Sequence, residues 1–483
     1  MTQIKAVTNK TLEGHFLSDT WRKAKKTYTI KNPATGKPLA KVAECTSTDA
    51  AQAASVAMEA FHLWKKKTAF ERSEILMRWF DLMMKNQEEL ARTMTQEMGK
   101  AIKESRGEVT YAASFIKWYA EEAKRVGGET FPAMAGHKRL MALKQPVGPV
   151  FAITPWNFPL AMVTRKAAPA LAAGCTFILK PAEQTPLSAL NLAALWEEAG
   201  GPSGTLQVLT ASDPVPLSDT LISDPRIRKI TFTGSTEVGK ILYKKSADTV
   251  KKISLELGGH APFLIFEDAD LEQAVKEAIA CKFRNAGQTC VCTNRIYVHS
   301  SIADEFAGRY AAAAKNLKVG DPLEPSTDIG PLVSKEGLQK VKLHVQDAVS
   351  KGAKLLTGGK AIKGLFFEPT VLTNVDDDMQ MMYEETFGPV APITTFDTDE
   401  EAIQMANDTP YGLASYIYTN DLSRAFKVSE ALEYGIVGVN DGLPSVAHAP
   451  FGGVKESGIG REGGHWGLEE YLEVKYISMA LHH

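Results

Sequence analysis

The chain has 483 residues, of which 44% are hydrophobic and 23% are charged, so it can bury a large core and should divide into two or three domains. Its 55 basic and 57 acidic residues give a net charge of −2, which excludes the basic surface expected of a nucleic-acid-binding protein or of one held on an anionic membrane. Five cysteines without metal-ligand spacing, no apolar signal region at Met1–Lys5 and no apolar run of about 18 residues predict a cytoplasmic protein without a metal site, disulfide framework or membrane span.

Helices dominate the first part of the chain. Lys31–Pro38 is typical of a turn between short strands, and Ser47–Lys65 carries apolar residues at helical spacing. From Ala69 to about Arg125 the apolar residues again recur at helical periods, which predicts long helices. Lys138–Lys144 then alternates as a strand, which we expect to project as an arm.

Strands alternate with helices from Val147 to Pro262, which indicates βαβ units and a parallel sheet. We predict strands at Val150–Ile153, Thr176–Leu179, Leu206–Leu209 and Lys229–Phe232, and helices at Thr164–Ala173 and Ser188–Ala199. The turn Gly234–Gly239 opens the next helix, where backbone amides can hold a diphosphate, although an ordinary strand-to-helix turn is the alternative. A second alternating region extends to about Tyr434, and Tyr471–Met479 is again strand-like.

Cys290 is the strongest candidate for chemistry. It follows a predicted helix, Asp270–Phe283, that Gly287 interrupts, and it precedes a predicted strand, Arg295–His299. A loop between rigid elements often presents reactive groups. A buried core thiol is the alternative, and the polar neighbours of Cys290 argue against it.

A thiol that attacks a carbonyl needs donors for the oxyanion and, for hydrolysis, a base. Asn157 in Thr154-Pro-Trp-Asn-Phe-Pro159 follows a strand and could donate, or could hold a proline-rich turn. Glu256 stands between two leucines, which would raise its pKa toward the range of a base, unless it points to solvent. No histidine lies near Cys290 in a Cys-His-Asn pattern, which disfavours a cysteine protease.

These segments resemble the successive motifs of the aldehyde dehydrogenase superfamily over essentially the whole chain. The motifs are Thr154-Pro-Trp-Asn-Phe-Pro, Lys180-Pro-Ala-Glu-Gln-Thr-Pro, Phe232-Thr-Gly-Ser, Leu255-Glu-Leu-Gly-Gly, Gly287-Gln-Thr-Cys, Glu385-Thr-Phe-Gly-Pro and Pro450-Phe-Gly-Gly-Val-Lys-Glu-Ser-Gly. The resemblance implies an α/β protein with a Rossmann-like NAD-binding domain (1–126 and 147–255) and an α/β catalytic domain (256–450). It also implies an oligomerisation arm (127–146 with the C-terminal segment 451–483) that pairs subunits into a homodimer or homotetramer.

The resemblance also implies roles for single residues. Cys290 would be the nucleophile, Glu256 the base, and Asn157 with the Cys290 N–H the oxyanion donors. The cofactor would lie against Ile153, Thr154, Pro155, Trp156, Lys180, Ala182, Glu183, Phe232, Gly234, Ser235, Val238, Leu257, Glu385 and Phe387. Glu183 would repel a 2′-phosphate and Lys180 would offset part of that repulsion, so NAD is the preferred cofactor and NADP the alternative. The segment Thr210–Pro214 departs from many relatives, which have a glycine after this strand.

The substrate is predicted to carry a carboxylate. Arg165, Arg284 and Ser445 resemble the residues that hold the substrate carboxylate in the succinate semialdehyde dehydrogenase branch, although Pro444 and His448 near Ser445 depart from it. The resemblance implies oxidation of succinate semialdehyde to succinate. Glutarate semialdehyde, or a broad range of aldehydes, is the alternative. Arg165 as a helix-surface residue and Arg284 as a C-terminal helix cation are the simpler interpretations.

Other classes fit the sequence less well. A relative that passes the acyl group to coenzyme A would have no use for the water-activating Glu256, and a structural member would not need Cys290 and Asn157. A scaffolding protein built on residues 69–125 is disfavoured by the βαβ region that follows. Cys292 could form a regulatory disulfide with Cys290, or be a bystander thiol.

Overall fold

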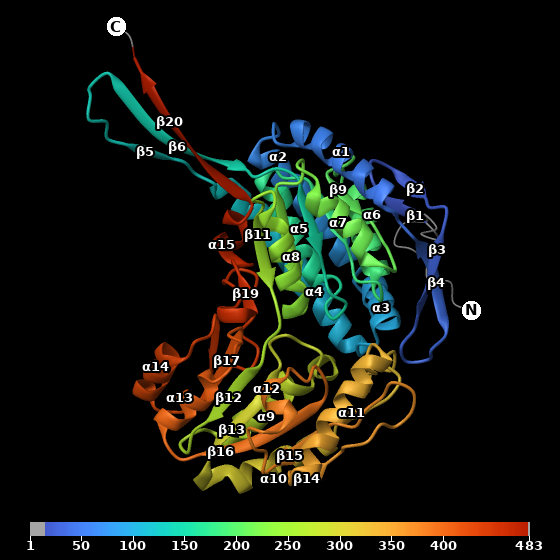
Figure 1. The fold of residues 1–483 in the computed structure, drawn as a ribbon, viewed down its shortest axis with the longest axis vertical. Coiled ribbons are helices and arrows are strands. Elements are labelled where there is room, and N and C mark those ends of the chain that lie inside the picture. Colours follow the sequence, from blue (N-terminus) through green and yellow to red (C-terminus); the bar gives the residue numbers. More distant parts are fainter. Residues whose placement is uncertain (1–14, 482–483) are drawn as a thin grey trace.

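The computed structural model describes residues 15–481. Residues 1–14, where we predict no signal region and where the predicted cofactor domain begins, lie outside the described residues, as do His482 and His483. Figure 1 shows two bodies, one above the other, and a narrow arm that projects from the upper body. No helix within residues 15–481 has both the length and the apolar composition needed to cross a membrane.

The upper body is built around an eight-stranded sheet in the order β19-β11-β10-β7-β8-β9-β1-β2. Its strands are β1 (His15–Leu17), β2 (Trp21–Lys23), β7 (Val150–Ile153), β8 (Phe177–Lys180), β9 (Leu206–Val208), β10 (Lys229–Thr233), β11 (Lys252–Glu256) and β19 (Gly458–Ile459). The strands from β11 to β9 run parallel, which confirms the predicted parallel sheet, and the other three pair antiparallel at its edges.

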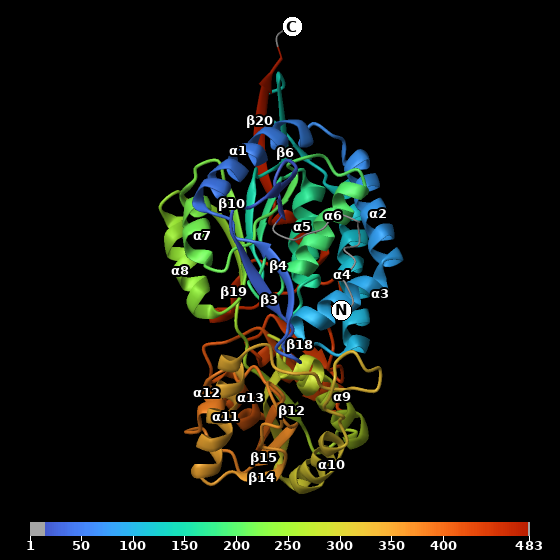
Figure 2. The ribbon, with the colours of Figure 1, turned by 90° about the vertical axis from the view of Figure 1, so that its right-hand side faces the viewer.

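Helices cover both faces of this sheet. They are α1 (Ser47–Trp64), α2 (Ala69–Lys85), α3 (Gln87–Met98), α4 (Ile102–Glu122), α5 (Ala161–Ala173), α6 (Pro186–Glu198), α7 (Pro214–Ser223) and α8 (Thr236–Ala247), with the 3-10 helix η1 (Ala123–Arg125). Figure 2 shows α7 and α8 on one side of the sheet and α2 to α6 on the other. A separate hairpin pairs β3 (Thr27–Lys31) with β4 (Pro38–Ala43), with the predicted turn between them.

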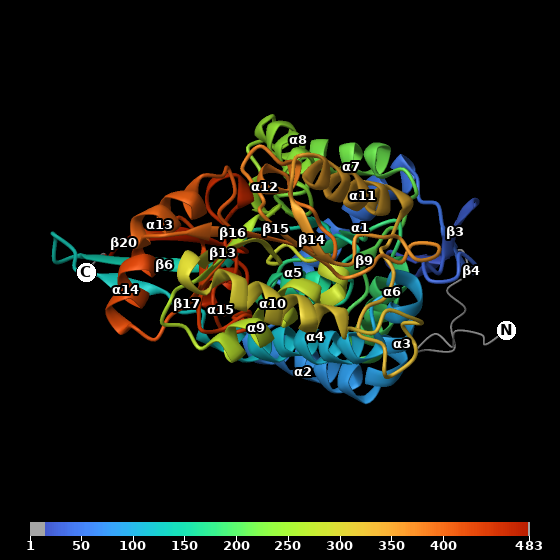
Figure 3. The same cartoon turned by 90° about the horizontal axis from the view of Figure 1, so that it is seen from below.

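The lower body contains a seven-stranded sheet in the order β14-β15-β16-β13-β12-β17-β18. Its strands are β12 (Ala261–Ile265), β13 (Thr293–His299), β14 (Lys354–Thr357), β15 (Thr370–Thr373), β16 (Val390–Phe396), β17 (Ala414–Tyr418) and β18 (Ile436–Val439). Its helices are α9 (Leu271–Phe283), α10 (Ala303–Lys315), α11 (Lys335–Ser350), α12 (Gln380–Tyr383), α13 (Asp399–Asn407) and α14 (Leu422–Ala431), with η2 (Arg284–Gly287) and η3 (Ser300–Ile302). Figure 3 shows α9 and α10 on one face of this sheet and α11 on the other. Each body buries its own hydrophobic core.

The arm consists of β5 (Glu129–Phe131), β6 (Lys138–Pro146) and β20 (Leu472–Ala480), paired antiparallel. Only the last part of the predicted C-terminal segment 451–483 belongs to it. The earlier part, with η4 (Lys455–Ser457), β19 and α15 (Gly464–Glu469), lies in the upper body, because β19 pairs with β11 and α15 packs against α4 and α5.

A buried carboxylate holds the start of α6, which follows the loop after β8. Glu97 of α3 is 1% exposed and accepts the backbone N–H groups of Leu187 at 2.8 Å and Ser188 at 2.9 Å. The first N–H groups of a helix have no partner within the helix, so a carboxylate is a suitable acceptor for them. Burial nevertheless raises the pKa of Glu97 to about 8. This contact fixes the segment between Lys180 and α6.

We expect Glu97→Ala to lower the free energy of unfolding by on the order of 3 kcal/mol, because two buried N–H groups lose their acceptor. Urea unfolding followed by circular dichroism measures this change. Glu88→Ala, on the exposed side of the same helix, is the control and should cost less than about 1 kcal/mol. Equal losses in the two variants would contradict the proposed role of Glu97.

Candidate active site

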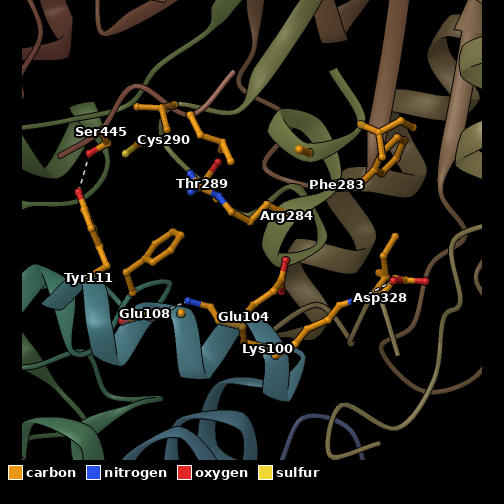
Figure 4. A pocket seen from close by; sticks show the side chains of 18 of the residues that line it. Lys100, Glu104, Glu108, Tyr111, Phe283, Arg284, Thr289, Cys290, Asp328 and Ser445 are labelled. Atoms are coloured by element: carbon orange, nitrogen blue, oxygen red, sulfur yellow. Dashed lines mark hydrogen bonds and ion pairs between the residues drawn. The ribbon is translucent and has the colours of Figure 1, made fainter. Parts of the chain in front are cut away.

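A cavity of about 590 Å³ lies where the two bodies meet. Residues of α4 and α5 line it from the upper body, and residues of α9, the Cys290 loop and the 317–329 segment line it from the lower body. Figure 4 shows the Cys290 thiol and the Arg284 side chain in the same hollow, with the α4 side chains opposite them. The predicted nucleophile Cys290 and the predicted carboxylate-binding residue Arg284 therefore line the same cavity.

The loop that carries Cys290 has a strained backbone. Asn285, Ala286 and Gly287 have φ values of 53°, 56° and 73°, so three consecutive residues adopt the left-handed conformation. Residues other than glycine rarely do so, because their Cβ clashes with the backbone. Gly287 also packs so closely that a Cβ there would collide with the Gly388 carbonyl oxygen. Tertiary packing, and not local preference, holds this loop.

Cys290 faces the carboxylate of Glu256 at the end of β11, with 3.9 Å between Sγ and Oε2. Glu256 is 3% exposed, and this burial raises its pKa to about 8. Burial, and then the charge of Glu256, raise the pKa of the Cys290 thiol well above its usual value. The alternatives of a core thiol and of a solvent-facing glutamate are both wrong, since Cys290 lines the cavity and Glu256 is buried. A Cβ at Gly259 would collide with the Cys290 carbonyl oxygen, so only a glycine at position 259 lets the Cys290 backbone lie this close.

Asn157 lies beside the same loop. Its Nδ2 donates to the Gln288 carbonyl oxygen at 3.1 Å, and its Oδ1 accepts the Phe158 N–H at 3.1 Å. The buried Lys100 donates to the Asn157 carbonyl oxygen at 2.9 Å. One amide hydrogen can serve Gln288, which leaves the second for a substrate oxyanion.

The predicted carboxylate-binding residues Arg165, Arg284 and Ser445 all line the cavity with Cys290. Arg284 forms no ion pair with another residue in the range 15–481, and its Nε has no hydrogen-bond partner there. Its guanidinium lies 5.5 Å from the centre of the Phe158 ring. A guanidinium in a cavity that has no ion-pair partner is suited to an anionic ligand.

Arg165 and Ser445 already have partners in the protein. Arg165 is 1% exposed and pairs with Glu462 at 2.7 Å, so the interpretation as a helix-surface residue is wrong. Glu462 also pairs with Lys166. The Ser445 hydroxyl forms a hydrogen bond of 2.5 Å with Tyr111 (Figure 4). Sequence reasoning missed Glu462 and Tyr111, since neither is near its partner in the chain.

Most of the predicted cofactor residues lie at the carboxyl ends of the parallel strands in the eight-stranded sheet. Ile153, Phe232 and Lys180 pair at the carboxyl ends of β7, β10 and β8, the edge where α/β sheets bind nucleotides. The other residues at this edge are Thr154, Pro155 and Trp156 after β7, Ala182 and Glu183 after β8, Gly234, Ser235 and Val238 at the start of α8, and Leu257 after β11. The Ser235 hydroxyl caps α8 by accepting the Val238 N–H at 3.4 Å.

Two further predicted cofactor residues come from the lower body. Glu385 accepts the Gly259 N–H at 3.1 Å, and burial raises its pKa to about 7. The Phe387 ring meets the Trp156 ring edge-on at 5.5 Å between centroids. Gly234 at the α8 start carries no side chain, and a Cβ there would collide with the Phe232 ring. Because Gly234 has no side chain, a diphosphate could approach the backbone N–H groups at the start of α8.

The sequence matches the model of the aldehyde dehydrogenase family over residues 21–477. The chain belongs to this family. The motif-based resemblance is thereby confirmed, and the chain is an NAD(P)-dependent oxidoreductase.

Three relatives illustrate the similarity. The mitochondrial succinate-semialdehyde dehydrogenase of Arabidopsis thaliana is 54% identical, covering 94% of this chain and 86% of the relative. The glutarate-semialdehyde dehydrogenase of Pseudomonas putida is 53% identical, covering 96% of this chain and 97% of the relative. The crystal structure of an Escherichia coli NADP-dependent enzyme is 50% identical, covers 97% of this chain and 98% of that chain, and superposes with a TM-score of 0.96.

Cys292, the second thiol of the loop, has a different environment from Cys290. It is fully buried, and its Sγ donates to the Lys282 carbonyl oxygen at 3.4 Å. All five cysteines are free thiols in this structure. A disulfide with Cys290 would require Cys292 to leave this contact, and reversible oxidation of the pair stays a prediction.

We expect the turnover rate at saturating aldehyde to rise as the pH increases through about 8, because Glu256 is a base only when deprotonated and its pKa is about 8. A profile of kcat from mildly acidic to mildly alkaline buffer measures this rise. Glu256→Gln removes the base and should flatten the profile. An unchanged profile in that variant would exclude Glu256 as the titrating group.

Proposed function

We propose that this aldehyde dehydrogenase oxidises succinate semialdehyde to succinate. The observation that carries the proposal is the Arg284 guanidinium, which forms no ion pair with a described residue and lines the cavity that also holds the Cys290 thiol. Arg165 and Ser445 line the same cavity, so three side chains with hydrogen-bond donors face it. A carboxylate at one end of a short substrate would bind there while the aldehyde at its other end reaches the thiol.

The chain's own residues account for the chemistry. Glu256 takes the thiol proton, and the thiolate forms a C–S bond with the aldehyde carbon. The Asn157 amide and the Cys290 N–H hold the resulting oxyanion. NAD(P), when bound, supplies the hydride acceptor for this step. The oxyanion collapses to a thioester on Cys290 as the C–H bond breaks and hydride leaves to that acceptor. Glu256, having released its first proton to solvent, then deprotonates a water that attacks the thioester carbon. The C–S bond breaks, the acid is released, and the Cys290 thiolate takes the proton back from Glu256.

The cofactor would be held along the edge already described. Lys180 and Glu183 would bind the adenosine ribose, Gly234 and the α8 amides the diphosphate, and Glu385 the nicotinamide ribose. Lys180 and Glu183 form an ion pair, which positions the Glu183 carboxylate next to that edge. The second carboxylate oxygen can accept a ribose hydroxyl but would repel a 2′-phosphate, so we propose NAD as the preferred cofactor.

Glutarate semialdehyde is the second candidate substrate. The cavity of about 590 Å³ has room for a longer chain, and the P. putida relative named for this substrate is 53% identical. One methylene is worth only about 1–3 kcal/mol of discrimination. The same donors would bind both acids.

We assign cofactor binding to residues 1–126 with 147–255 and catalysis to residues 256–450. The three-stranded arm exposes the apolar side chains of Val474 and Tyr476, which supports pairing with a second copy in a homodimer or homotetramer. The five free thiols support a reducing, cytoplasmic location.

The first prediction of this proposal is that Arg284→Ala loses at least roughly tenfold more kcat/KM with succinate semialdehyde than with butanal, which lacks the carboxylate. Reduced-nicotinamide absorbance measures both rates. Arg309→Ala, an exposed arginine on α10, is the matched control and should change neither. Equal losses on the two aldehydes in Arg284→Ala would show that the enzyme does not select its substrate through this cation.

The second prediction concerns the cofactor. The unaltered enzyme should have a higher kcat/KM with NAD than with NADP, and Glu183→Ser should raise the NADP-to-NAD ratio by about tenfold, because it removes the repelling charge. Glu198→Ser, at the exposed end of α6, should leave the ratio unchanged. A preference for NADP in the unaltered enzyme would overturn the proposed role of Glu183.

A further inference from the structure

Arg284, the arginine that we propose binds the substrate carboxylate, stands next to a strained turn. Arg284 is followed directly by the three left-handed residues Asn285, Ala286 and Gly287. Without external contacts this turn would relax toward ordinary backbone angles, and the Arg284 side chain would move with it. The contacts that hold the turn therefore also determine where the guanidinium lies.

One of these contacts comes from the other body of the molecule. The Glu104 carboxylate on α4 accepts the Asn285 backbone N–H at 2.9 Å and lines the substrate cavity. On the far side of the turn, the Asn285 side chain donates to the Asn157 carbonyl oxygen at 3.1 Å. The turn is thus held between α4 and the Asn157 segment.

The cationic side chains Lys100, Lys103 and Arg165 form their ion pairs with carboxylates other than Glu104, whose carboxylate instead accepts the Asn285 N–H. Lys100 pairs with Glu108, Lys103 with Asp328, and Arg165 with Glu462. Within residues 15–481, neither Glu104 nor Arg284 forms an ion pair, although both line the cavity. Glu104 holds the peptide that follows Arg284 and leaves the guanidinium free for a ligand. In Figure 4 the Glu104 side chain reaches from α4 toward the Arg284 segment.

We infer that Glu104 is a positioning residue for Arg284 and so determines specificity for substrates that carry a carboxylate. This inference rests on the proposed function. Glu104 acts through the Asn285 N–H, and the carboxylate of the substrate, not the aldehyde, is the group whose binding depends on it.

Steady-state kinetics of the full-length enzyme with succinate semialdehyde and with butanal test the inference. Glu104→Ala removes the acceptor, and we expect KM for succinate semialdehyde to rise about tenfold, with a rise for butanal at least several times smaller. Glu104→Gln keeps an acceptor oxygen, so its KM for succinate semialdehyde should stay within about threefold of the unaltered enzyme. Glu121→Ala, an exposed glutamate on the same helix, is the control and should change neither KM.

Two results would overturn the inference. One is an equal loss on both aldehydes in Glu104→Ala, which a purely structural role would produce. The other is a glutamine variant as impaired as the alanine variant, because glutamine retains the acceptor. If Arg284→Ala loses more activity on succinate semialdehyde than on butanal while Glu104→Ala loses the same on both, the proposed function stands and only the role of Glu104 fails. If Arg284→Ala loses the same activity on both aldehydes, the proposed function itself fails.

Discussion

The burial of the Glu256 carboxylate beside Cys290 is the constraint on which the rest of the site depends. Desolvation raises the pKa of this group to about 8, which suits the carboxylate to the role of general base that we propose for it, without a histidine. The base is useful only if the thiol comes within reach. The 3.9 Å separation between Sγ and Oε2 requires a glycine at position 259 and a loop held in a conformation that Asn285 and Ala286 do not favour.

One helix supplies much of the packing that holds this arrangement. Glu104, Glu108 and Tyr111 follow one another at i, i+4 and i+7 along α4, so they share one face. Each contacts a different part of the site: Glu104 the Asn285 N–H, Glu108 the N–H groups that begin α5, and Tyr111 the Ser445 hydroxyl. The upper body thus holds the Cys290 loop of the lower body in place, and the cavity at their junction depends on both.

The sequence predicted those features that depend on residues close together in the chain. Helical periodicity gave α9, strand–helix alternation gave the parallel sheet, and the two leucines around Glu256 indicated its raised pKa. Contacts between distant segments were not predictable in this way. The helix expected from Thr164 begins at Ala161, because the Glu108 carboxylate accepts the N–H groups of Leu160 and Ala161. For the same reason the sequence did not reveal the roles of Glu462 and Tyr111 or the inclusion of β19 in the eight-stranded sheet, because their partners lie about 200 residues or more away in the chain.

The two cavity arginines differ in a way that bears on specificity. Arg165 forms an ion pair with Glu462, so a ligand carboxylate would share this cation, whereas Arg284 forms no direct ion pair with a described residue. Desolvating an unpaired guanidinium is costly, and a substrate carboxylate recovers that cost where an uncharged aldehyde cannot. If Arg284 binds the substrate as we propose, charge therefore discriminates strongly between aldehydes, while chain length, at about 1–3 kcal/mol per methylene, discriminates weakly.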